Sequence, residues 1–218
     1  MDDNRVKAII IANGILEYPE KIRDILISRS FTGSGTIVIS ADGGVSNTLK
    51  LGLSPDIIIG DMDSINENVK KLAQAKHIYA PHDKDESDTR LAVEYAAKMG
   101  IKNIIITGAL GGRPDHAFAN MMLLASPGPA DMDIKIIDSD SEIFVINDSQ
   151  KISGEPGKLI SIFSLSPYTY FIKTKGLKYE LVDERLDLSP VRGLSNIFTA
   201  TEAEIDIREG QLLIIRQL

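Results

Sequence analysis

The chain has 218 residues, of which 43% are apolar and 25% are charged, proportions typical of a soluble globular protein. Its 31 acidic residues outnumber its 24 basic ones and give a net charge of −7, which argues against a nucleic-acid partner because binding to phosphate backbones needs a basic surface. The absence of cysteine excludes disulfides, thiolate metal sites and a cysteine nucleophile.

Over residues 1–147, short apolar runs alternate with amphipathic stretches. The runs resemble parallel strands that are buried on both faces. The clearest helical pattern covers Asp88–Met99, where apolar residues recur every four positions before a stop at Gly100. This alternation predicts an α/β fold, an open and mostly parallel sheet with helices on both faces. The expected strands are VKAIIIA, TIVIS, DIIIG, HIYA, NIIITG and DIKIID.

Residues 148–218 have a different pattern, with short and partly alternating apolar runs separated by Gly, Pro and Ser. The alternation in AEIDIREGQLLII predicts a hairpin with its turn near Glu209–Gly210. We therefore expect a smaller all-β domain over residues 148–218, which at this size needs a partner surface for stability. No apolar run is long enough for a membrane span or a signal peptide, so we expect a cytoplasmic protein that does not bind membranes.

Loops rich in Asp and Gly follow four of the expected strands, whereas the connections at the opposite edge are plain helix-to-strand turns. Ligands of open parallel sheets bind beyond the carboxyl ends of the strands, so we expect the functional site at this edge. The four loops are ADGGVS, DMDSI, PHDKDESD and GALGGRPDH.

Two of these loops carry closely spaced carboxylates. Asp61 and Asp63 stand one residue apart directly after an apolar run, and unpaired carboxylates are costly to bury. Either they cap and precede a helix, or they hold Mg²⁺, a hard cation that leaves positions open for substrate phosphates. Asp85 and Asp88 pose the same choice, since Asp85 could cap the next helix and Asp88 lie in its first turn. The density of like charges favours a cation.

The loop GALGGRPDH has the composition of a phosphate-binding loop. Gly111 and Gly112 let the backbone approach an anion closely, and N–H groups at the start of the following helix can hold phosphate. Arg113 offers a planar fork for phosphate oxygens, and Pro114 suits the first helical position. A glycine-rich turn with an exposed arginine is the alternative. The sequence thus predicts a metal-and-phosphate site, but spacing alone does not define the reaction.

The ordered set ADGG, PDIIIGDMDSI, DKDESDT, GALGGRPDH, GLKYEL and SN resembles the thiamin pyrophosphokinase (thiamin diphosphokinase) family over nearly the whole chain. The resemblance implies a first domain that binds ATP and Mg²⁺ and a sandwich that binds thiamin and mediates dimerisation. It implies transfer of the pyrophosphoryl group of ATP to the hydroxyl of thiamin, which gives thiamin pyrophosphate and AMP. It also implies a homodimer whose active sites lie where the domains of two subunits meet.

The resemblance assigns roles by motif. It implies that Asp61, Asp63 and Asp88 hold the metal and, with Arg113, form the catalytic set. It places ATP against Asp42, Gly43, Asp85, Gly111, Gly112, Arg113, Asp115 and His116, and thiamin against Tyr179, Ser195 and Asn196. Tyr179 stands where the family often has Trp, which reduces the area available for stacking on the vitamin.

Three other functions remain open at this stage. A pyrophosphokinase that acts on another small alcohol, such as a pterin, would share the ATP-binding loops. A Mg²⁺-dependent phosphatase of the haloacid-dehalogenase type also places Asp-x-Asp after an apolar strand, but on its first strand and followed by Thr or Val. Here the motif follows the third expected strand and precedes Ser64. The third is a non-catalytic sensor of nucleotide or thiamin.

Overall fold

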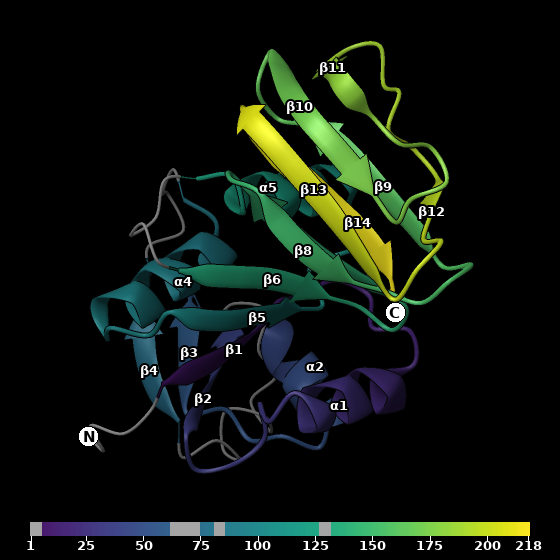
Figure 1. The fold of residues 1–218 in the computed structure, drawn as a ribbon. Helices are drawn as coiled ribbons and strands as arrows, with labels where there is room; N and C mark the ends of the chain where they lie inside the picture. Colours follow the sequence, from purple (N-terminus) through teal and green to yellow (C-terminus); the bar gives the residue numbers. More distant parts are fainter. Residues whose placement is uncertain (1–5, 62–74, 81–85, 127–131) are drawn as a thin grey trace. The chain divides into compact units, whose positions relative to one another are not determined.

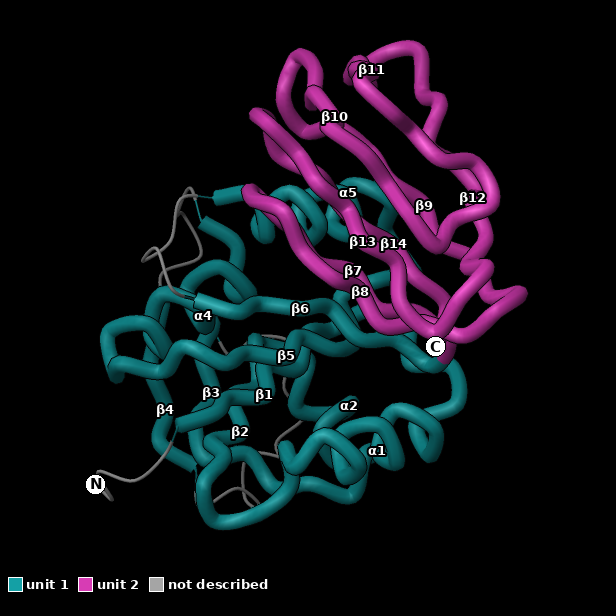
Figure 2. The backbone as a smooth tube through the Cα atoms, in the orientation of Figure 1, with its two compact units in different colours: residues 1–139 teal, residues 140–218 magenta. Residues whose placement is uncertain are grey.

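The computed structural model describes residues 6–61, 75–80, 86–126 and 132–218. The chain divides into two compact units, Met1–Ser139 and Asp140–Leu218 (Figure 2). The boundary precedes the change of pattern near residue 147, because the strand β7 (Ser141–Ile146) pairs antiparallel with the last strand of the second unit.

Unit 1 contains the parallel sheet expected from the apolar runs (Figure 1). Its strands lie in the order β6-β5-β1-β2-β3-β4, and every neighbouring pair is parallel. All residues of β2 are buried, whereas β4 at the end of the sheet is mostly exposed. The strands are β1 (Lys7–Ile11), β2 (Thr36–Ala41), β3 (Ile57–Gly60), β4 (Lys76–Tyr79), β5 (Asn103–Thr107) and β6 (Asp133–Ile137).

The described helices of unit 1 are α1 (Pro19–Ser28), α2 (Gly44–Lys50), α4 (Asp88–Lys98) and α5 (Pro114–Leu123). The chain steps from β1 through β2 and β3 to β4 at the sheet edge, then returns across β1 to β5 and β6. Because such crossovers are right-handed, steps in opposite directions place α1 and α2 on one face and α4 and α5 on the other. The predicted α/β fold with helices on both faces is confirmed. The predicted stop at Gly100 is also found, with φ +76° directly after the C-cap of α4.

The strand order reverses between β1 and β5, which are neighbours in the sheet although the connections that follow them run in opposite directions. The loops that leave β1 and β5 therefore diverge at this point. In open α/β sheets, a reversal of this kind creates the crevice in which ligands bind.

Unit 2, all of whose residues the structure describes, is the predicted β-sandwich. One sheet has the order β12-β9-β14-β7 and the other β11-β10-β13-β8, with antiparallel pairing in both. Side chains from both sheets form one core, in which Phe171 and Phe198 are the largest fully buried residues. The strands besides β7 are β8 (Gln150–Ser153), β9 (Leu159–Ser164), β10 (Tyr168–Lys175), β11 (Val182–Asp187), β12 (Asn196–Ile197), β13 (Glu202–Glu209) and β14 (Leu212–Gln217).

The hairpin predicted for the end of the chain is wrong. The turn lies at Gly210 as expected, with φ +107°, but β13 pairs with β8 and β10 while β14 pairs with β7 and β9. The turn therefore carries the chain from one sheet to the other. Ile205 of β13 and Ile214 of β14 both lie in the sandwich core. The alternation of apolar and polar residues therefore predicts which face of each strand is buried, but not which sheet the strand joins.

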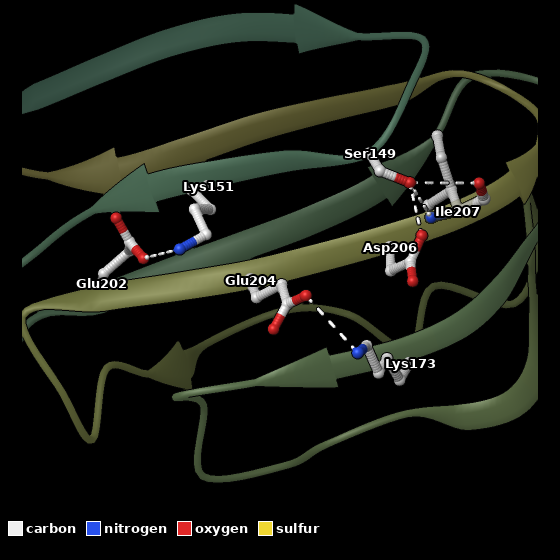
Figure 3. Close-up of polar contacts among 7 residues, drawn as sticks. All are labelled: Ser149, Lys151, Lys173, Glu202, Glu204, Asp206 and Ile207. Atoms are coloured by element: carbon white, nitrogen blue, oxygen red, sulfur yellow. Dashed lines mark hydrogen bonds and ion pairs between the residues drawn. The ribbon is translucent and has the colours of Figure 1, made fainter.

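The outer face of β13 is polar, as the alternation predicted (Figure 3). Glu202 and Glu204 pair with Lys151 and Lys173 at 3.0 and 3.5 Å, and the Ser149 hydroxyl donates to Asp206 at 2.5 Å. Exposed pairs of this kind stabilise a fold only slightly. Among the helices of the described residues, none has the length and apolar character needed to cross a bilayer.

Candidate active site

A cavity of about 650 Å³ in unit 1 lies at the carboxyl ends of β1, β2 and β5. Its walls come from residues 12–15 after β1, from the end of β2, from the start of α4 and from the loop between β5 and α5. This is the edge at which the sequence predicted the site. Of the predicted residues, the cavity is lined by Asp42, Asp88, Gly111, Gly112, Arg113, Asp115 and His116.

The remaining predicted residues of this unit lie beside the cavity or outside the described residues. Gly43 follows Asp42 directly. Asp61 follows Gly60, where an added Cβ would lie 2.9 Å from Cβ of Asp42, so the β3 loop emerges next to that aspartate. Asp63 and Asp85 are in the segments that the structure does not describe.

Asp42 has the features of a ligand-binding residue. Its φ is +45°, a value that non-glycine residues adopt at some cost and that clusters at functional sites. Its backbone N–H donates to the Ile59 carbonyl at 2.7 Å, which fixes the turn. One carboxylate oxygen, Oδ1, is buried and has no hydrogen-bond partner in the described part of the chain. Since a buried polar atom without a partner is costly, this oxygen indicates a ligand or a cation.

The carboxylates at this edge fit Mg²⁺, which binds oxygen ligands. Asp42 and Asp88 line the cavity, and Asp61 directly follows Gly60, which packs on Asp42. Within the described ranges no three acidic or histidine residues form a complete cation site. Two of the predicted carboxylates, Asp63 and Asp85, fall outside those ranges.

Arg113 and Asp115 form a two-bond ion pair on the cavity wall. Arg113 Nε donates to Asp115 Oδ1 at 3.2 Å, and Nη2 donates to Oδ2 at 2.5 Å. The hydrogen bonds and opposite charges raise the pKa of Arg113 and lower the pKa of Asp115. The pair orients the guanidinium and leaves its Nη1, which takes no part in these bonds, available to a phosphate oxygen.

The turn before α5 depends on glycine. Gly111 and Gly112 have φ of +76° and +70°, and Pro114 occupies the start of α5 as predicted. The N-cap residue Arg113 makes no side-chain capping bond, and the helix start favours an anion. The start of α4 differs from the expectation, because the Ser87 hydroxyl and not Asp85 caps it, accepting from the Arg90 N–H at 3.2 Å.

The sequence reasoning missed the loop after β1. Asn13, Gly14 and Ile15 line the cavity. Hydrogen bonds fix this loop to the end of β5, from Ala12 N to Thr107 O at 2.9 Å, and to the loop after it, from Gly14 N to Gly108 O at 2.7 Å. The sequence contains a signal for this loop, because Asn-Gly directly follows the first apolar run. This loop is less conspicuous than the other four because it contains no charged residue.

In unit 2 the predicted thiamin residues lie close together. Asn196 is 8% exposed, and its amide holds the backbone of Tyr179: Oδ1 accepts from Tyr179 N at 3.0 Å, and Nδ2 donates to Tyr179 O at 2.8 Å. The Tyr179 side chain is 60% exposed. Ser195 has φ +58°, and its N–H donates to the Ser161 hydroxyl at 3.1 Å. Asn196 thus presents Tyr179 to solvent, with its own amide occupied.

Comparisons with known proteins relate both units to one family. A family model described as "Thiamin pyrophosphokinase, catalytic domain" matches residues 29–137, and a second, "Thiamin pyrophosphokinase, vitamin B1 binding domain", matches residues 145–212. The chain belongs to the thiamin pyrophosphokinase family. The family suggested by the motifs is therefore confirmed, and the catalytic-domain match contains most of the cavity wall.

Individual members of the thiamin pyrophosphokinase family agree with this result over most of the chain. The thiamine pyrophosphokinase of Bacillus subtilis (strain 168) is 29% identical over 192 residues, which is 85% of this chain and 89% of that protein. The crystal structure of thiamine pyrophosphokinase from Bacillus subtilis matches with a TM-score of 0.83 at 28% identity, covering 97% of this chain and 98% of that one. The structure from Geobacillus thermodenitrificans gives 0.81 at 26% identity, with 97% of each chain covered. Yeast thiamin pyrophosphokinase shares the fold, with a TM-score of 0.75 at 17% identity. The match covers 100% of this chain and 88% of the yeast chain.

Proposed function

We propose that this chain is a thiamin pyrophosphokinase, which transfers the pyrophosphoryl group of ATP to the hydroxyl of thiamin and releases AMP. The observation that carries the proposal is the presence of both family domains on one chain, with the cavity in the first, next to an Asp42 oxygen that has no partner among the described residues. The exposed Tyr179 in the second supplies an aromatic face for the vitamin.

In this proposal Mg²⁺ is held by Asp61, Asp63 and Asp88. When bound, the ion neutralises charge on the phosphates and fixes their geometry. The remaining polyphosphate contacts come from Arg113 Nη1 and from N–H groups at the start of α5. Further contacts of ATP are assigned to Asp42, Gly43, Asp85, Gly111, Gly112, Asp115 and His116.

The reaction needs positioning and charge stabilisation more than covalent catalysis. The thiamin hydroxyl oxygen attacks the β-phosphorus of ATP, and the bond from that phosphorus to the oxygen shared with the α-phosphate breaks. That oxygen leaves with AMP, and its developing charge lies where Arg113 and the helix start stabilise it. A carboxylate of the cavity accepts the proton of the hydroxyl.

The vitamin stacks on Tyr179 in this proposal, and Ser195 and Asn196 complete the same surface. Tyr179 and Asn196 belong to unit 2, whereas the ATP cavity belongs to unit 1. The family resemblance adds a cytoplasmic homodimer to the proposal, in which the two kinds of site come from two subunits. Sedimentation of the purified protein tests the dimer, because a monomer at all concentrations contradicts it.

One assay tests the function. The protein is incubated with ATP, Mg²⁺ and thiamin, and the nucleotide product is identified. We expect AMP and thiamin pyrophosphate in equal amounts. ADP would indicate a simple kinase, phosphate release from many esters a phosphatase, and saturable binding without turnover a sensor. Turnover with a pterin alcohol and not with thiamin would change the acceptor and leave the ATP site as proposed.

A further inference from the structure

The loop after β1 has a polar side chain, Asn13, to which none of the predicted roles applies. Asn13 is exposed and lines the cavity. The residues on both sides of it are hydrogen-bonded to β5 or to the loop after β5. It therefore lies at the point where the strand order reverses, between β1 and β5, which is the position where open α/β sheets bind their ligands.

A second asparagine fixes the backbone on both sides of Asn13. Asn47 of α2 is 3% exposed, and its Nδ2 donates to Ala12 O at 2.9 Å and to Gly14 O at 2.8 Å. Those carbonyls flank residue 13. Asn47 itself does not line the cavity, so any effect on a ligand has to pass through the loop that it holds.

The Asn13 side chain lies over Gly43, close to Asp42. A Cβ added at Gly43 would lie 2.4 Å from Asn13 Nδ2 and 2.6 Å from its Cγ, so any side chain there would displace the amide. No hydrogen bond among the described residues uses the Asn13 amide, although the backbone of Ala12 and Gly14 on either side of it is held by hydrogen bonds. An amide on a cavity wall that has no partner among the described residues, carried by a fixed stretch of backbone, is available to a ligand.

The neighbours of Asn13 identify the ligand chemistry. Ile15 packs on the glycine turn before α5, since a Cβ at Gly111 would lie 3.1 Å from the Ile15 Cβ. The loop after β1 thus contacts the turn assigned to phosphate, and Arg113 lines the same cavity. A neutral amide donor beside these groups suits an anionic oxygen.

We propose that Asn13 Nδ2 donates a hydrogen bond to a phosphate oxygen of the nucleotide, and that buried Asn47 is the positioning residue that holds Asn13 in place. This inference rests on the proposed function, because it places the ATP polyphosphate in the cavity. It adds the loop after β1 to the ATP-binding loops.

The test measures nucleotide binding without turnover, by calorimetric titration of the full chain with Mg²⁺ and the α,β-methylene analogue of ATP. We expect Asn13→Ala to weaken binding about tenfold, since a hydrogen bond to a charged group contributes on this scale. Asn13→Asp should weaken it further, because a carboxylate would face phosphate. The control is Asn103→Ala, which changes an exposed asparagine at the opposite end of the same sheet and should bind as the wild type does.

A double-mutant cycle tests the role of Asn47. Asn47→Ala should weaken binding in the wild-type background and have little further effect in the Asn13→Ala background, while it lowers the melting temperature in both. Equal losses of affinity in the two backgrounds would overturn the positioning role. Unchanged affinity of Asn13→Ala would overturn the role of Asn13. If the wild-type chain forms AMP and thiamin pyrophosphate, either result leaves the proposed function intact; a wild-type chain that neither binds the analogue nor forms AMP contradicts both.

Discussion

The loop after β1 in unit 1 and the Tyr179 segment in unit 2 are built in similar ways. Each exposes a side chain of interest, Asn13 or Tyr179, and each is held by a buried asparagine from another element. The difference lies in how the amide is used. Asn47 donates both bonds to two carbonyls, whereas Asn196 donates to the carbonyl and accepts from the N–H of one residue. The comparison teaches that a buried amide can fix the backbone beside or beneath an exposed side chain through hydrogen bonds within the protein.

The largest expected effect tests whether the chemistry belongs to unit 1. Asp61→Ala should reduce AMP formation by about 10³-fold or more. Mg²⁺ would lose a carboxylate ligand, and the charge on the phosphates would then be less well neutralised. Circular dichroism should show an intact fold. Asp24→Ala, on the exposed face of α1, is the matched control and should retain activity. Retained activity of Asp61→Ala would remove that residue from the metal site.

A smaller loss is expected at Arg113. Arg113→Lys should lower kcat about 100-fold, since lysine keeps the charge but cannot bond Asp115 in two places and offer a further N–H to phosphate. Steady-state kinetics with ATP and thiamin measure this. Full activity of the lysine variant would show that charge alone suffices at this position.

Replacing each buried amide by aspartate sharpens the comparison between the two units. Asn47→Asp loses both donated bonds and places a charge against two carbonyls, so we expect a loss of about 3 kcal/mol in the free energy of unfolding. Asn196→Asp keeps the bond accepted from Tyr179 N and should lose about half as much. Urea unfolding near neutral pH measures both. Equal losses, or the reverse order, would break the comparison.

In unit 2, Tyr179→Ala should raise the KM for thiamin about tenfold and leave kcat nearly unchanged, because an aromatic contact contributes on the order of 1 kcal/mol. Asn196→Ala should do the same, and the double variant should resemble either single one if Asn196 acts through Tyr179. The variant Tyr179→Trp provides a direct readout, because the chain otherwise contains no tryptophan. Its fluorescence should be quenched by thiamin, and additive effects in the cycle would assign Asn196 a separate role.

The smallest effect concerns the pH dependence of the Arg113–Asp115 pair. Because the pair lowers the pKa of Asp115, its contribution is complete above the ordinary aspartate pKa and is lost only as pH falls through the lower value in the folded chain. Both side chains are exposed, so the effect on stability is small. An NMR titration of Asp115 should give a midpoint below that of free aspartate, and Arg113→Ala should move it upward.

The parallel sheet and the site edge could be predicted because they depend on local patterns. Apolar runs such as NIIIT mark buried strands, and the loops that follow them share one edge whatever the strand order. The sheet membership of β13 and β14 could not be predicted, since alternation fixes the buried face and nothing else. The hydrogen bonds of Asn47 and Asn196 could not be predicted either, because their partners are distant in sequence. Asn47 holds Ala12 and Gly14, and Asn196 holds Tyr179.

The position of β14 has a consequence for how the protein is made. This strand lies between β9 and β7, and Leu218 N donates to Asp140 O at 2.8 Å, so the last strand of unit 2 pairs with its first. During synthesis on the ribosome, the parallel sheet of unit 1 can assemble while unit 2 is still emerging. The sandwich can close only when residues 212–217 have left the exit tunnel, and until then β7 and β9 expose unpaired backbone to chaperones and to other nascent chains.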